Sequence, residues 1–297
     1  MATMSDNAIF GVDFTSSPRR TKPIRVAAGQ RQGAVVRLTG LLSLLSLDAF
    51  SEWLARPGPW VAGLDLPFGL PRELVLALGW PTDYAALIAH YASLDRADIR
   101  GRFAAFCAAR PAGSKFAHRA CDGPAGSSPS MKWVNPPVAW MLHAGVPRLI
   151  AAGVHLPGHL DGDPSRVALE AYPGLLAREL IGRRSYKSDT KAAQTPERLI
   201  ARKDVVDALE QGRTRLGLRL KLSHAQRDEL VADASGDSLD AVLAMIQAAW
   251  AAQQQRYGWP EGVDPIEGWI VGAEGKALGD ERRQLPAPRP DGRRASR

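Results

Sequence analysis

Two short apolar runs predict buried strands, and each run leads to an aspartate. Residues 8–15 contain Asp13, and residues 60–65 end at Asp65. Strands that are apolar throughout are typical of the centre of an α/β sheet, where both faces are covered. A carboxylate at the tip of such a strand is costly to desolvate unless it is paired or binds a metal. Both aspartates are therefore candidate functional residues.

The rest of the pattern is mostly helical. Apolar residues recur at helical spacing along residues 238–255 and form one stripe, which predicts the clearest helix of the chain. Alternating residues on either side of a turn-prone segment predict a hairpin. The predicted strands after the first are residues 24–28, 34–38, 60–65, 167–171 and 269–271, and the predicted helices are residues 48–55, 82–92, 98–109, 136–152, 175–180, 196–209, 225–233 and 238–255.

This order of elements predicts an α/β fold with a mixed sheet flanked by helices. We expect a single domain over residues 8–275. Within it, residues 72–160 are too many for a loop and predict a large helical insertion that caps one edge of the sheet. Residues 279–297 are rich in arginine and proline and lack an apolar period, so they predict a disordered basic tail.

Composition narrows the class of protein. The chain has 297 residues, of which 45% are hydrophobic, so it can bury a large core. It contains no apolar run long enough for a transmembrane helix, its N-terminus does not have the pattern of a signal peptide, and two cysteines do not suggest a disulfide framework. These features predict a cytoplasmic protein with no membrane partner. The net charge of +7 favours a polyanion such as nucleic acid as partner, whereas the oligomeric state stays open.

The carboxylates suggest a metal site assembled from distant segments. Asp13 and Asp65 would lie at the carboxyl ends of neighbouring strands, where ligands collect in open α/β sheets. Asp237 and Asp240 open the last long helix. Oxygen ligands suit Mg²⁺ or Mn²⁺. We therefore predict Asp13, Asp65, Asp237 and Asp240 as metal ligands, with Glu170 competing with Asp237 for the fourth place.

Each carboxylate also has an ordinary structural explanation. Asp13 could bond to the backbone of its own turn, and Asp65 could cap a following helix. Asp237 could be an N-cap, with Asp240 three residues later completing a capping box. Glu170, at the end of a short apolar run, could ligate metal, orient a basic residue or form a local salt bridge. The sequence leaves these alternatives open.

Basic residues occur in two segments that flank the predicted strand tips. Phosphate groups are bound mainly by lysine and arginine, and a loop rich in glycine, serine and proline carries several such residues. A second set lies in a segment rich in serine, threonine and aspartate. We predict that Lys115, His118, Arg119 and Lys187 bind substrate and that Lys191 steadies a phosphate during catalysis, with Asp13, Asp65, Asp240 and Glu170 as the other catalytic residues.

Five short motifs carry a resemblance to a known family. They are GVDFTSS at 11–17, GLDLPFGLP at 63–71, LEAYP at 169–173, Lys191 followed by Arg198-Leu199, and DSLDAVLAMIQAAW at 237–250. With these motifs in this order, residues 8–272 resemble the RNase H-like superfamily, specifically the uncharacterised group of predicted RNase H-fold nucleases known as domain of unknown function 429. That group often has a histidine two positions after the glutamate, where this chain has Tyr172.

The resemblance implies an RNase H-like sheet and a pair of metal ions. In RuvC-like members of the superfamily, the ions are held by an aspartate on the first strand, a carboxylate on the fourth strand and two acids at the last helix. These roles would fall on Asp13, Asp65, Asp237 and Asp240.

The resulting functional prediction is a metal-dependent phosphodiester hydrolase, and specifically a nuclease that uses two Mg²⁺ or Mn²⁺ ions. Two alternatives remain at this level. The chain could be a non-catalytic nucleic-acid-binding module with the same fold. It could also be a nucleotide or phosphate-ligand enzyme of the actin-like ATPase branch, although it has neither a duplicated core nor a second glycine-rich phosphate loop.

Overall fold

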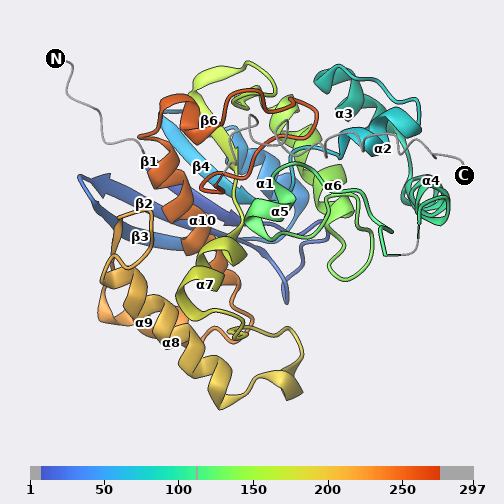
Figure 1. The fold of residues 1–297 in the computed structure, drawn as a ribbon. Coiled ribbons are helices and arrows are strands. Elements are labelled where there is room, and N and C mark those ends of the chain that lie inside the picture. The colour runs from blue at the N-terminus through green and yellow to red at the C-terminus, as the bar shows by residue number, and fades with distance from the viewer. Residues whose placement is uncertain (1–7, 112, 275–297) are drawn as a thin grey trace, which may run out of the picture.

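The structure is a computed structural model and describes residues 8–111 and 113–274. Its centre is a mixed sheet of seven strands in the order β5-β6-β4-β1-β2-β3-β7 (Figure 1). The strands are β1 (Ala8–Asp13), β2 (Ile24–Gln32), β3 (Val35–Leu44), β4 (Trp60–Asp65), β5 (Val154–His155), β6 (Asp163–Glu170) and β7 (Arg219–Lys221). The predicted α/β class with a mixed sheet flanked by helices is confirmed.

Strand direction changes on one side of the central strand. β2 runs antiparallel to β1 and to β3, so the predicted hairpin is present, with longer strands than the sequence pattern indicated. On the other side, β4 runs parallel to β1, and β6 runs parallel to β4. The carboxyl ends of β1, β4 and β6 therefore meet at one edge of the sheet.

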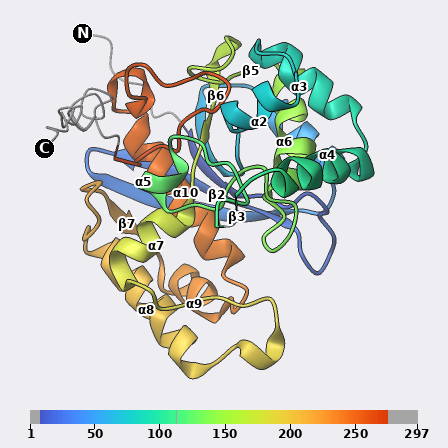
Figure 2. The same ribbon diagram turned by 45° about the vertical axis from the view of Figure 1, so that its right-hand side comes forward.

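Helices cover both faces of the sheet (Figures 1 and 2). One layer contains α1, α3, α4 and α6, and the other contains α7, α8 and α10. The helices are α1 (Leu47–Leu54), α2 (Arg72–Ala77), α3 (Tyr84–Ser93), α4 (Arg96–Ala108), α5 (Asp122–Ala125), α6 (Val138–Ala151), α7 (Pro173–Ile181), α8 (Pro196–Glu210), α9 (His224–Ala232) and α10 (Asp237–Ala251), with two 3₁₀ turns, η1 (Lys191–Ala193) and η2 (Gln255–Gly258). Among the described residues, no helix combines the length and apolar character needed to cross a bilayer.

Side chains along β1 point alternately to the two faces of the sheet, and each face has its own hydrophobic core. Phe10 and Val12 point to the layer of α1 and α6, where Phe10 meets Trp53 edge-on with ring centroids 5.3 Å apart. Ile9 points to the opposite layer, which is packed around α10. Fourteen of the fifteen residues of α10 are buried, which explains why its sequence is apolar almost all round.

Two glycines let α10 pack directly against the sheet. A Cβ atom at Gly11 would overlap the carbonyl oxygen of Ala241 and the backbone nitrogen of Met245. A Cβ atom at Gly63 would likewise overlap the carbonyl oxygen of Ala244. Because neither strand has a side chain here, the helix backbone lies against the backbones of β1 and β4. The first turn of α10 is thereby held beside the tips of both strands.

The sequence prediction was wrong in parts of the periphery. Residues 269–271 form no strand: Val271 donates one backbone hydrogen bond to the carbonyl of Glu170, 2.9 Å away, instead of a ladder. The short strands β5 and β7 were not predicted, because two or three residues carry too little pattern. The segment between β4 and β6 contains α2–α6 and β5. The predicted tail, residues 279–297, lies outside the described residues.

Candidate metal centre

Three aspartates from three elements converge at the carboxyl edge of the sheet. Asp13 and Asp65 are direct partners in the parallel register of β1 and β4. Asp240 comes from the first turn of α10 and is fully buried. One carboxylate oxygen from each of the three lies within 4.8 Å of the others. Oxygen donors at this spacing, on separate rigid elements, fit a hard divalent cation.

Burial and neighbouring acids raise the pKa of all three carboxyl groups. Burial first, and then the neighbouring Asp240, raise the pKa of Asp65 to about 7. The same two causes raise the pKa of Asp13 well above its ordinary value. Burial also raises the pKa of Asp240, although Lys187 and Tyr186 oppose this. Three acids in mutual repulsion are an electrostatically costly arrangement that a bound cation would relieve.

Asp240 also has two partners from the loop after α7. The hydroxyl of Tyr186 donates a hydrogen bond to Oδ1, and the ammonium group of Lys187 forms an ion pair with Oδ2. Desolvation lowers the pKa of Lys187, but Asp240, Tyr186, Asp13 and Asp65 together raise it well above its ordinary value. Lys187, predicted as a substrate-binding residue, therefore lies beside the carboxylate cluster as a positive charge paired with Asp240.

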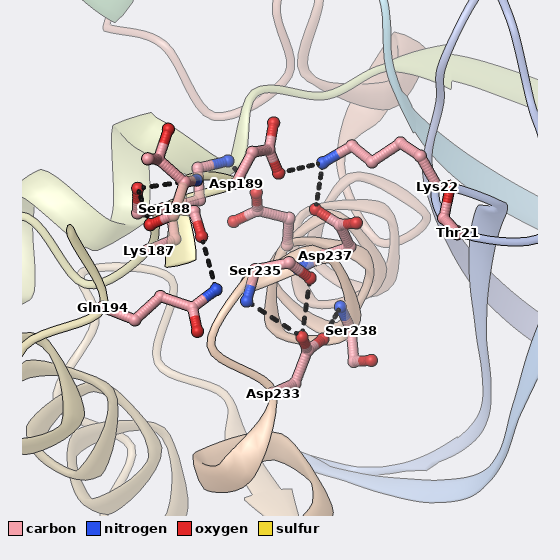
Figure 3. Close-up of polar contacts among 12 residues, drawn as sticks. Thr21, Lys22, Lys187, Ser188, Asp189, Gln194, Asp233, Ser235, Asp237 and Ser238 are labelled. Carbon is pink, nitrogen blue, oxygen red and sulfur yellow. Dashed lines mark hydrogen bonds and ion pairs between the residues drawn. The ribbon is translucent and has the colours of Figure 1, made fainter. Parts of the chain in front are cut away.

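Asp237, predicted as a metal ligand or as an N-cap, pairs with a lysine. The residue at the N-cap of α10 is Gly236, with φ of 77°, and Asp237 is the first helical residue. Its Oδ1 lies 2.8 Å from Nζ of Lys22, which also pairs with Asp189 at 2.7 Å (Figure 3). The helix start is instead held by Asp233, which accepts from the backbone N–H of Ser238 at 2.9 Å. Asp237 thus lies beside the three-aspartate cluster and is bound to a cation of the protein.

Glu170 is held by an arginine. Nη1 and Nη2 of Arg119 donate to the two carboxylate oxygens of Glu170 at 2.8 and 2.7 Å, and the backbone N–H of Phe68 donates at 2.9 Å. Arg119 also pairs with Asp122 at 2.9 Å, and all three side chains are buried. Of the alternatives for Glu170, the structure shows an ion pair that fixes Arg119. The predicted role of Arg119 in gripping substrate and that of Glu170 in catalysis stay predictions.

A cavity of about 670 Å³ opens over the carboxylates. Asp13, Asp65, Glu170 and Asp237 contribute to its lining, together with Lys187 and Arg119. Its walls come from the loop after β1, the N-terminus of α4, the segment leading into α6 and the loop after Lys187. Four of the five predicted acidic residues and two of the five predicted basic residues therefore surround one space.

Three predicted basic residues lie elsewhere. Lys115 and His118 line a separate, smaller depression with Arg110 and Phe116, and neither contributes to the lining of the large cavity. Lys191 is exposed in η1 and also lies outside that lining. Their proposed contacts with substrate have no geometric support at the carboxylate cluster.

The ordinary explanations for the strand-tip aspartates are not seen. In the turn after β1, the backbone N–H of Ser17 is 3.5 Å from Oγ1 of Thr15, and within residues 8–111 the Asp13 carboxylate accepts no hydrogen bond from this turn. The helix after Asp65 begins at Arg72, with Pro71 as its N-cap. The absence of these local partners leaves both carboxylates available at the cavity floor.

Sequence reasoning missed three residues of this region. Tyr186 and Lys22 reach the site through contacts between distant segments, and Asp122, in the short helix α5, pairs with Arg119 three residues before it. The first two contact the acids of α10 from positions 54 and 215 residues away along the chain. The only hint in the sequence was the polar character of the segment around Lys187. It pointed to the lysine but not to the neighbouring Tyr186.

Comparison of the chain with protein-family models, with curated proteins and with solved structures returned no match.

Proposed function

We propose that this protein is a metal-dependent phosphodiester hydrolase, most specifically a nuclease, with Asp13, Asp65 and Asp240 as metal ligands. The observation that carries the proposal is the convergence of these carboxylates within 4.8 Å, with Asp13 and Asp65 lining a cavity and Asp240 buried next to them. Mg²⁺ and Mn²⁺ both accept such oxygen ligands. The number of ions remains part of the proposal, as the resemblance implies two.

The placement of the three acids supports the resemblance to RNase H-like nucleases. The resemblance implies an aspartate on the first strand, a carboxylate on the fourth strand and acids at the last helix. Asp13 ends β1, Asp65 ends β4, and Asp240 lies in the first turn of α10, the last α-helix of the described chain. Asp237 is the fourth acid that the resemblance implies, and it would have to exchange Lys22 for a metal ion.

The protein's own groups would prepare the reaction in two ways, and a bound cation would add a third contribution. Asp13, Asp65 and Asp240 provide negative charge on rigid elements, which fixes the position of a cation. A divalent cation, when bound, supplies Lewis acidity toward a phosphoryl oxygen and toward water. Lys187 provides a positive charge beside the cluster that can bind a phosphate oxygen.

The test uses the purified full chain with Mg²⁺ or Mn²⁺ and labelled single-stranded DNA, duplex DNA, single-stranded RNA and RNA–DNA hybrid. We expect cleavage of at least one substrate that is abolished by a chelator and by Asp13→Asn or Asp240→Asn. Asp48→Asn is the matched control, because Asp48 is exposed in the first turn of α1 and does not line the cavity. Urea unfolding of each variant shows whether the fold is retained.

Calorimetric metal titration separates the alternatives. If Asp13→Asn loses both metal binding and cleavage, the result supports the hydrolase. If the protein binds polynucleotide but neither binds metal nor cleaves the substrate, the result favours a non-catalytic nucleic-acid-binding module. Tight, Mg²⁺-dependent binding of ATP without cleavage of any polynucleotide would instead favour a nucleotide enzyme.

A further inference from the structure

The cavity above the carboxylates has an apolar side. Phe14, Val138, Trp140 and Met141 contribute to its lining, together with two prolines that precede α6. Trp140 is held in place by the packing of α6, since only 7% of its surface is exposed. An apolar wall this close to an acidic floor has no use in binding a metal or a phosphate alone. It indicates a ligand with a flat or apolar part next to its charged part.

Cations and hydroxyl groups surround the rest of the cavity. Arg96, at the start of α4, lines it and lies with its guanidinium 5.4 Å from the centroid of the Trp140 ring. One nitrogen of Arg96 donates to the backbone carbonyl of Ser16 at 3.4 Å, so the side chain is directed toward the loop after β1. Further polar lining comes from Thr15, Ser16, Ser17, Arg19, Lys22, Ser127, Ser128, Tyr172 and Asp189, the last of which is paired with Lys22. These groups can bind anionic oxygens and sugar hydroxyls.

The volume limits how much nucleic acid can enter. About 670 Å³ falls within the range of roughly 300–1,000 Å³ that is typical of sites for small ligands. In a duplex, each base is paired along one edge and stacked on both faces, so it cannot present a face to a protein side chain. A base must be unpaired before it can lie against an aromatic wall.

We propose that the cavity takes one unpaired nucleotide, with its base against the Trp140 wall, its phosphate toward Asp13 and Asp65 and Arg96 close to the phosphate. The proposal rests on the proposed function and specifies its substrate class: single strands, unpaired ends or short oligonucleotides, and not intact duplex. Arg96 and Trp140 are the specificity-determining residues. Both come from the segment between β4 and β6, so that segment would select the substrate.

The first experiment compares Mn²⁺-dependent cleavage of one sequence as a single strand, a blunt duplex and a duplex with an unpaired 3′ end. We expect kcat/KM for the single strand to be at least about tenfold higher than for the blunt duplex, with the unpaired end in between. Arg96→Ala should lower the single-strand value about tenfold. Arg100→Ala is the matched control, because Arg100 is exposed one turn later in α4 and does not line the cavity.

The second experiment does not depend on turnover. Calorimetry in the presence of Mn²⁺ measures binding of a nucleoside 5′-monophosphate, of ribose 5-phosphate and of inorganic phosphate to the full chain. We expect the nucleotide to bind about tenfold more tightly than ribose 5-phosphate, which corresponds to one stacked base. Trp140→Leu should remove this difference and Trp140→Phe should retain it, and urea unfolding reports whether each variant folds.

The outcomes distinguish the two proposals. Equal cleavage of blunt duplex and single strand, or equal binding of nucleotide and ribose 5-phosphate, overturns the inference about the cavity and leaves the hydrolase intact. Absence of cleavage on every substrate, with nucleotide binding that depends on Trp140, overturns the hydrolase and retains the nucleotide site. Unchanged kinetics in both Arg96→Ala and Trp140→Leu also overturns the inference.

Discussion

Gly11 of β1 lies directly beneath Ala241 of α10, with no room for even a methyl group between the strand and the helix backbone. Asp240 precedes Ala241, and Asp13 follows Gly11 by two residues. Close packing of strand and helix therefore determines how near the two aspartates lie. Stability and metal binding should both depend on this glycine.

Gly11→Ala should destabilise the protein by about 1–3 kcal/mol or more, because the added methyl group forces α10 away from the sheet. The displacement should also weaken divalent-metal binding through Asp240. Gly40→Ala is the matched control, since a Cβ at that strand position meets nothing within 4 Å, and it should change stability by less than about 0.5 kcal/mol. Urea unfolding and calorimetric metal titration measure the two effects. Equal stability of the two variants would contradict this account.

The buried ion pairs of Arg119 lead to a second prediction. Arg119→Met would leave Glu170 and Asp122 buried without their cation, so we expect a loss of about 3–5 kcal/mol in the free energy of unfolding. Arg184→Met is the control: Arg184 pairs with Asp204 at the surface, and its loss should cost about 0–1 kcal/mol. Comparable losses in the two variants would show that the buried network is not a major source of stability.

Asp65 makes the stability of the metal-free protein depend on pH. Its folded-state pKa of about 7 lies above the ordinary value of 3.8, so between these pH values the folded state binds more protons than the unfolded state. The free energy of unfolding contributed by this group therefore falls as pH rises from about 4 to 7. Subtracting the pH profile of Asp65→Asn from that of the wild type should reveal this slope. A flat difference would contradict the shifted pKa.

Saturating Mn²⁺ should change how the stability of the protein depends on pH. Metal ligands bind as deprotonated carboxylates, so metal binding strengthens as pH rises. We expect the increase in Tm caused by Mn²⁺ to be larger at pH 8 than at pH 5. Asp48→Asn should show the same pH dependence as the wild type, whereas Asp13→Asn should show a much smaller Mn²⁺ effect at both pH values.

His159 should produce a slope of opposite sign in acid. Burial lowers its pKa to about 3, while Nδ1 lies 2.6 Å from the carbonyl oxygen of Pro265. The ring is 4.3 Å from that of Tyr84 between centroids, which keeps it away from water. Below pH 6.5 the unfolded state binds a proton that the folded state does not, so stability falls as pH decreases from about 6.5 to 3. Across this pH range, the free energy of unfolding of His159→Gln should fall less steeply than that of the wild type.

Lys187 competes electrostatically with a bound cation. Its ammonium group contacts Asp240, so Lys187→Met should strengthen divalent-metal binding about tenfold or more, because it removes a like charge from the site. If Lys187 also binds a phosphate, the same variant should cleave substrate more slowly. Lys191→Met is the control and should change neither quantity, because Lys191 is exposed in η1 outside the cavity lining. An effect of Lys191→Met on cleavage would instead restore its predicted catalytic role.

The sequence by itself determined the central elements and the three aspartates that converge at the sheet edge. The apolar runs that end in Asp13 and Asp65 had to be buried strands, because only a position covered on both faces accommodates such runs. The stripe that begins at Leu239 required a long helix with Asp240 in its first turn. Parallel strands share one edge, so the meeting of Asp13 and Asp65 was already implied by their positions at the strand tips.

Tertiary structure alone decided the partners of the other charged residues. Pairing of Asp237 with Lys22 and of Glu170 with Arg119 joins residues 215 and 51 positions apart, and no local pattern records such contacts. The same holds for the contact of Tyr186 with Asp240 and for the placement of Lys115 and His118 away from the cavity. Periodicity reports which face of an element is buried, whereas the choice of a charged partner depends on which distant segments the packed core brings together.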